Sequence, residues 1–139
     1  MIKFNPSLLA LTLACLAGEC HGAGGIVVIG NSNVANLDTA TLQRIYTGKA
    51  IQVDGVSVTA VNSTSGSALR NRFLQSYLNE DDDKYVAYWI KRRYAGLGAP
   101  PRELASSNAI INYVKVTPGA IGYIDEAELE PGLNVLIKP

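Results

Sequence analysis

The sequence predicts a three-layer α/β domain, and two observations carry that prediction. Short runs of β-branched residues, of which residues 26–29 are the clearest, alternate with amphipathic stretches of helical period. The composition suits a packed core, since 47% of the 139 residues are hydrophobic and 17% are charged. A chain of this length accommodates one domain and excludes a large multidomain enzyme.

The first predicted elements follow in order from residue 24. Residues 26–29 are typical of a buried strand, because a continuous apolar run suits a strand covered on both faces. Asp38 then offers a helix cap, and Gly48 can end that helix in a left-handed conformation. An Asp-Gly turn at residues 54–55 precedes an alternating strand over about residues 56–61.

The second half of the chain continues the alternation with three helices and two strands. A helix after residue 67 has an apolar stripe of Leu69, Phe73, Leu74, Tyr77 and Leu78. The acidic run 80–83 predicts the solvated start of the next helix, which ends near Gly96. We expect this helix to bury one side made of Val86, Trp89, Ile90 and Tyr94. Ser106 or Ser107 caps a further helix, and residues 120–124 and 133–137 are the two closing strands.

Residues 1–23 have the pattern of a secretory signal peptide, which leaves residues 24–139 as the domain. Lys3 provides a positive start, residues 8–17 form an apolar core, and small residues follow. Cleavage after Ala17 and cleavage around residues 22–23 both fit. A membrane anchor is disfavoured, because it needs about 20 apolar residues. A lipid anchor on Cys15 remains the alternative.

The predicted domain has few of the residues that conventional catalytic and metal-binding sites use. The only histidine, His21, and the only cysteines, Cys15 and Cys20, all lie in this leader. His-based catalysis, a disulfide framework and a thiolate zinc site therefore have no candidates in the domain. The carboxylates near residues 125–130 lack the spacing of a calcium site. We expect a protein that is no enzyme and carries no cofactor or metal.

Charge argues against nucleic acid as a partner. The chain has 12 basic and 12 acidic residues, whereas binding to phosphate backbones normally needs a basic excess. A local basic group, residues 91–93 with Arg102, suits a solvated helix end or a docking surface for an anionic partner.

The segment that stands out is the loop between the strand at 56–61 and the following helix. It contains one amide, four hydroxyls and one glycine: Asn62, Ser63, Thr64, Ser65, Gly66 and Ser67. Backbone N–H groups at such a strand-to-helix turn, with hydroxyl donors beside them, provide the chemistry that holds phosphate or sulfate. Arg70, one turn into the helix, would add positive charge. The competing interpretation is an ordinary helix cap.

Three blocks of residues carry a resemblance to a known family. They are residues 37–49, the strand and Ser-Gly-Ser loop at 56–67 with Phe73 after it, and residues 108–124, which include the run TPGAIGYI. In order and spacing these blocks resemble the periplasmic phosphate-binding proteins, the receptors of phosphate ABC transporters. The resemblance implies a single-lobe periplasmic-binding-protein-like α/β domain with a mixed sheet.

Two departures from the family pattern bear on the ligand. A full receptor closes two lobes over its ligand, whereas this chain has the length of one lobe. The family also places an Arg shortly before its Ser-Gly-Thr loop, where this chain has Asn62. By resemblance the ligand is an inorganic oxyanion, phosphate first, held by residues 62–67 and Arg70.

The resemblance also implies a periplasmic location, a role in phosphate uptake or sensing, and an ABC permease or other envelope protein as partner. A second copy of the chain could cover the anion, so a homodimer is included among the partners. The alternative function is an envelope interaction module that keeps the fold without the ligand.

Overall fold

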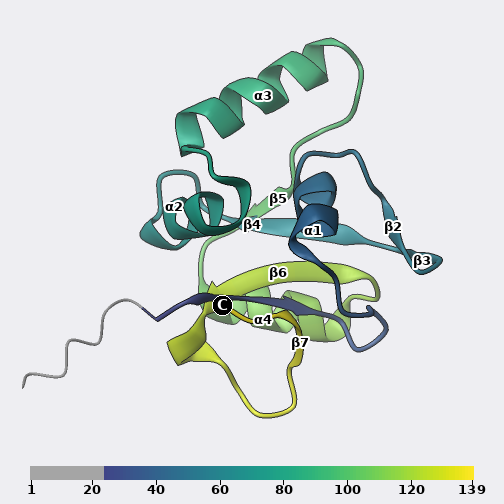
Figure 1. Ribbon diagram of the computed structural model, residues 1–139, viewed down its shortest axis with the longest axis vertical. Coiled ribbons are helices and arrows are strands. Elements are labelled where there is room, and N and C mark those ends of the chain that lie inside the picture. Colours follow the sequence, from purple (N-terminus) through teal and green to yellow (C-terminus); the bar gives the residue numbers. More distant parts are fainter. Residues whose placement is uncertain (1–23) are drawn as a thin grey trace, which may run out of the picture.

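The computed structural model describes residues 24–139, a mixed five-stranded sheet with helices on both faces (Figure 1). The sheet strands are β1 (Ile26–Gly30), β4 (Thr59–Ser63), β5 (Arg102–Leu104), β6 (Ala120–Asp125) and β7 (Asn134–Ile137), in the order β5-β4-β6-β1-β7. β1 runs antiparallel to β6 and β7, whereas β4 runs parallel to β5 and β6. The predicted three-layer α/β class with a mixed sheet is confirmed.

Four α-helices and two short helical turns complete the fold. They are α1 (Thr39–Tyr46), α2 (Ala68–Phe73), the π-helical turn η1 (Leu74–Leu78), α3 (Asp82–Tyr94), α4 (Ser107–Val116) and the 3₁₀ turn η2 (Glu126–Glu128). α1 and α2 cover one face of the sheet, α4 covers the other, and α3 lies outside α1 and α2 (Figure 1). A small hairpin of β2 (Gln52–Val53) and β3 (Val56–Ser57) projects from the sheet.

Strand β1 shows why the core has two halves. Ile26 and Val28 pack in the apolar cluster beneath α1 and α2, while Val27 and Ile29 pack in the cluster beneath α4. Successive side chains of a strand point to opposite faces, so both faces of β1 are covered. The continuous β-branched run predicted this strand correctly.

The helix signals also predicted several boundaries correctly. Asp38 caps α1, where its Oδ1 accepts a hydrogen bond from Thr41 N at 2.7 Å. Gly48 follows α1 with φ of +74°, and Ser106 caps α4. The Asp-Gly turn at 54–55 has positive φ at both residues and closes the β2–β3 hairpin.

Three elements differ in detail from the sequence expectations. The strand expected over residues 56–61 divides into β3 and β4, because its first part pairs in the hairpin and its second in the sheet. The helix expected through residue 78 does extend to Leu78, but from Leu74 it changes from α to π hydrogen bonding, and Asn79 at φ of +51° ends it. Strand β5 was not predicted, since residues 98–104 lack a run of apolar residues.

The predicted buried side of α3 was wrong at three of its four residues. Trp89 is buried at 5% exposure, but Val86, Ile90 and Tyr94 are 37%, 51% and 91% exposed. The side that packs inward contains Tyr85, Tyr88 and Trp89. Both sides of this helix carry apolar residues, so the apolar pattern does not determine which side packs against the core.

The predictions for residues 1–23, namely the signal peptide with its two cysteines and His21, lie outside the described residues. Within residues 24–139 no helix combines the length and the apolar character needed to cross a bilayer.

Candidate functional site

The loop at residues 64–67 joins the carboxyl end of β4 to α2, as the sequence predicts. Ser67 is the N-cap of α2, and its Oγ accepts a hydrogen bond from Arg70 N at 3.2 Å. The Oγ atoms of Ser63 and Ser67 are 2.9 Å apart, so these hydroxyls bond each other. Gly66 has φ of +78°, a conformation that L side chains rarely adopt. The capping interpretation is therefore correct for Ser67, while the N–H groups before it serve another purpose.

The free N–H groups of the loop hold carboxylate oxygens of the protein itself. Ser65 N donates to Glu103 Oε1 at 2.7 Å. Gly66 N and Ser65 Oγ both donate to Asp82 Oδ2, at 2.8 and 2.6 Å. The position where an external oxyanion is expected is thus occupied by Asp82 from α3 and Glu103 from β5.

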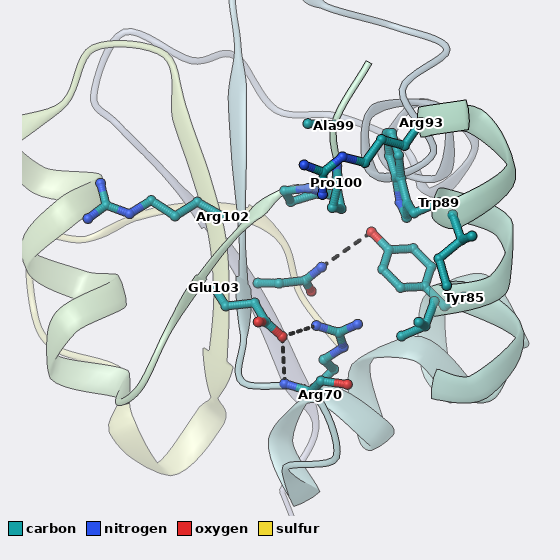
Figure 2. A pocket seen from close by; sticks show the side chains of 13 residues that line it. Arg70, Tyr85, Trp89, Arg93, Ala99, Pro100, Arg102 and Glu103 are labelled. Atoms are coloured by element: carbon teal, nitrogen blue, oxygen red, sulfur yellow. Dashed lines mark hydrogen bonds and ion pairs between the residues drawn. The ribbon is translucent and has the colours of Figure 1, made fainter. Parts of the chain in front are cut away.

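Arg70 completes this arrangement from beneath the loop. Although it is charged, only 4% of it is exposed. Its Nε donates to Asp82 Oδ1 at 2.7 Å and its Nη1 donates to Glu103 Oε1 at 2.8 Å, the latter visible in Figure 2. The guanidinium carbon also lies 5.2 Å from the centre of the Tyr85 ring. A buried cation needs such partners, because unpaired burial costs several kcal/mol.

The charges of this cluster sum to a negative value, with one guanidinium facing two carboxylates. Burial raises the pKa of Asp82, but hydrogen bonds from Ser65 and Gly66 and the nearby Arg70 charge outweigh it and lower that pKa overall. Asp82 therefore stays ionised at neutral pH. A second anion reaches these donors only by displacing a carboxylate.

Asn62, which the sequence placed with the ligand-binding residues, is buried below the loop at 1% exposure. Its Nδ2 donates to the Tyr85 hydroxyl at 3.2 Å, and its Oδ1 accepts from the Tyr123 hydroxyl at 2.7 Å. Ser63 N donates to the same Tyr123 oxygen at 2.9 Å. Burial raises the pKa of Tyr85 to about 12, so this network stays neutral. Asn62 supports the end of β4 from within the core.

The structure brings most of the predicted site residues together, and it adds two that the sequence analysis missed. Ser63, Ser65, Gly66, Ser67 and Arg70 form one cluster with Asp82 and Glu103. Thr64 is exposed, and its carbonyl accepts a hydrogen bond from Ser67 N at 3.0 Å.

Neither of the two missed residues stands out in the sequence as part of a site. Asp82 belongs to an acidic run expected to be solvated, and Glu103 lies on the strand that was not predicted. The pairing of Asn62 with Glu103 between parallel strands β4 and β5 brings that carboxylate to the loop. The sequence carries no local signal for either residue, because Asp82 and Glu103 lie 12 and 33 residues from Arg70 along the chain.

A cavity of about 520 Å³ adjoins the loop, between α3 and the segment at residues 99–103 (Figure 2). Its polar end contains Asn62, Ser65, Arg70 and Glu103, and its walls include Val86, Trp89, Ile90, Pro100 and Pro101. Arg93 extends over one end of the cavity. Arg102 also borders it, but its guanidinium lies over the Tyr113 ring at 5.9 Å, on the other side of β5.

Metal chemistry has no site among residues 24–139, where no group of three or more His, Cys, Asp or Glu side chains could hold an ion. The arrangement at residues 63–70 is instead one of hydrogen-bond donors and a guanidinium facing oxygen anions.

Comparison with solved structures identifies the architecture. No protein-family profile matches the chain, and no curated protein matches it either. The chain is similar to an ABC-type phosphate transport receptor from Vibrio cholerae (17% identity, TM-score 0.60). It is also similar to PstS from Borrelia burgdorferi (18%, 0.59) and to a protein described as a phosphate ABC transporter substrate-binding protein, solved with bound phosphate, from Clostridium perfringens (21%, 0.56).

These matches cover 81% of this chain but only 45%, 46% and 44% of the V. cholerae, B. burgdorferi and C. perfringens chains, so it spans less than half of each neighbour's length. At such low identity the likeness concerns the fold. The resemblance expected from the sequence is confirmed at that level: residues 24–139 have the α/β fold found in part of the phosphate-transport receptors.

Proposed function

We propose that the protein is a secreted, single-lobe solute-binding domain that takes up an inorganic oxyanion, phosphate, at the loop of residues 63–67. One observation carries the proposal: Ser65 N, Gly66 N, Ser65 Oγ and the Arg70 guanidinium already hold carboxylate oxygens. The same donors suit the oxygens of phosphate. The choice of phosphate among oxyanions follows the solved neighbours, which are described as phosphate receptors.

In this proposal Asp82 and Glu103 are internal competitors of the ligand. Phosphate binds when it replaces the Asp82 carboxylate on Ser65 and Gly66, while Arg70 stays in place below. Glu103 is the easier one to displace, because its side chain is 48% exposed against 13% for Asp82. Since Asp82 remains ionised at neutral pH, we expect the wild-type affinity to be modest.

Calorimetric titration of the full chain with phosphate, sulfate and nitrate tests this function. Asp82→Ala removes the competitor and should tighten phosphate binding by at least about 10-fold, as expected for hydrogen bonds to a charged group of about 1.5–3 kcal/mol. Glu80→Ala is the matched control, because it removes a carboxylate two residues away from Asp82, whereas the loop donors bond Asp82 and Glu103. It should change the affinity little.

A second candidate function is an interaction module that keeps this fold without a small ligand. The observation that favours it is that the loop donors Ser65 N, Gly66 N and Arg70 are satisfied within the domain, around a net negative charge. If neither phosphate nor sulfate binds the wild type or Asp82→Ala at millimolar concentration, that result favours the interaction module. It should then co-purify with an envelope protein.

Secretion and an ABC permease or other envelope partner belong to the same proposal. If residues 1–23 are a signal peptide, mass spectrometry of the protein from the periplasmic fraction should find a start between Gly18 and Gly24. An intact Met1 on that protein contradicts secretion, and a lipid on Cys15 indicates the anchored alternative.

A further inference from the structure

One side of α3 carries a row of exposed apolar side chains, of which Val86 and Ile90 also border the cavity of about 520 Å³ next to residues 99–103. Val86, Ile90 and Tyr94 are spaced four residues apart and are 37%, 51% and 91% exposed. Residues at this spacing form one stripe along a helix. Ala87, beside Ile90 on the surface, is also exposed and leaves room for close approach. A continuous exposed apolar stripe of this kind marks an interaction site.

The charges at the two ends of this stripe are opposite. Asp81 and Asp83 lie at the start of α3, and Lys91 and Arg93 lie in its last turn. Among residues 24–139, Asp83, Lys91 and Arg93 take part in no ion pair. Two such helices side by side match acid with base when they run antiparallel, and they place like charges together when they run parallel.

We propose that a second copy of this chain docks on α3 in antiparallel orientation, with the two-fold axis passing midway between Val86 and Ile90. In this arrangement Val86 faces Ile90 of the partner subunit, and Ile90 faces Val86 of the partner subunit. Asp83 then lies level with Arg93 of the partner subunit. Such a contact is isologous, since each copy supplies the same stripe, and it forms a closed dimer.

The position of α3 permits this contact. α3 is the helix farthest from the sheet and forms the outer edge of the molecule (Figure 1). Val86, Ile90 and Arg93 also border the 520 Å³ cavity, so a docked copy lies beside the mouth of that cavity. The inference does not depend on oxyanion binding, because the stripe and its charges lie outside the loop at 63–67.

Sedimentation velocity of the full chain, under reducing conditions and over roughly 1 µM to 1 mM, tests the dimer. We expect dimerisation that strengthens with concentration and weakens at high salt. Ile90→Glu places a carboxylate against the apolar side chain of Val86 of the partner subunit in both halves of the contact and should abolish the dimer. Val116→Glu is the matched control, since Val116 is a 78% exposed apolar residue on α4, and this variant should dimerise as the wild type does.

Charge reversals test the orientation. Asp83→Lys and Arg93→Glu should each weaken dimerisation by about 10-fold or more, because each creates two repulsive contacts. The double variant should restore it, and an equimolar mixture of the two single variants should form heterodimers. The proposal is overturned by a chain that stays monomeric at 1 mM, by a dimer that Ile90→Glu leaves intact, or by a double variant that fails to recover. A monomer that binds anionic vesicles through Ile90 would assign the stripe to a lipid surface instead.

Discussion

At the scale of single residues, the site is defined by Asp82 and Arg70. Arg70 could remain buried only with carboxylate partners, and Asp82 provides both a salt bridge at 2.7 Å and the acceptor for two loop donors. One carboxylate thus holds β4, α2 and α3 together at the end of the sheet. The donors of this loop suit an anion, and the Asp82 carboxylate already occupies them.

The lowered pKa of Asp82 predicts a pH-dependent stability. A group whose folded pKa lies below its unfolded value stabilises the fold above the unfolded pKa, and this contribution is lost as the pH falls through the folded pKa. Asp82→Asn should therefore lower the free energy of unfolding by about 1.5–3 kcal/mol at pH 7. The difference from wild type should shrink below about pH 4. Urea unfolding at pH 7 and pH 3 measures it, and a difference that is the same at both values contradicts the assigned ion pair.

At the scale of elements, aromatic rings connect the helices to the sheet. Phe73 of α2 stacks on Tyr123 of β6 with ring centres 3.8 Å apart, and it also contacts Tyr46 of α1 at 4.7 Å. The Tyr46 carbonyl in turn accepts hydrogen bonds from Tyr85 and Trp89 of α3. These contacts place α1, α2 and α3 on one face and so position the loop.

Truncation of Phe73 tests this packing. Phe73 is fully buried, so Phe73→Ala should cost about 3–5 kcal/mol of unfolding free energy through lost burial and the cavity that remains. Val116→Ala, at an exposed helix position, should stay within about 0.5 kcal/mol of wild type. Chemical denaturation measures both variants. A loss of less than about 1 kcal/mol for Phe73→Ala would contradict its place in the core.

Two glycines allow the cost of a strained backbone to be distinguished from the cost of a steric clash. Gly48 and Gly96 both have positive φ, +74° and +73°, but a Cβ at Gly48 would lie 2.7 Å from Trp89 Cη2 while a Cβ at Gly96 would meet nothing within 4 Å. Gly96→Ala should cost about 1 kcal/mol from backbone conformation alone. Gly48→Ala should cost at least about 1 kcal/mol more, because α3 must shift away from α1. Equal losses in denaturant unfolding would show that Trp89 can move freely.

At the scale of the whole molecule, the layers and the polar loop could be predicted from the sequence, whereas the carboxylates that fill the loop could not. The run at 26–29 could be recognised as a doubly covered strand from its residues alone. The inward side of α3 could not be recognised in this way. Tyr85 and Trp89 form one apolar side of the helix and Val86 and Ile90 form another, so the sequence fits either side facing the core. The contacts that fill the loop join residues 16 and 38 apart in the chain, so only the folded structure reveals them.

Asp82 and Glu103 occupy the donors of the loop that we propose as the oxyanion site. Phosphate titration of Asp82→Ala and of Asp82→Ala combined with Ser65→Ala tests this claim. We expect saturable binding to the single variant, tighter than to the wild type. We also expect a loss of roughly 10-fold or more when the Ser65 hydroxyl is removed as well. Equal affinities for wild type and both variants, or no binding to any of them at millimolar phosphate, would contradict the claim.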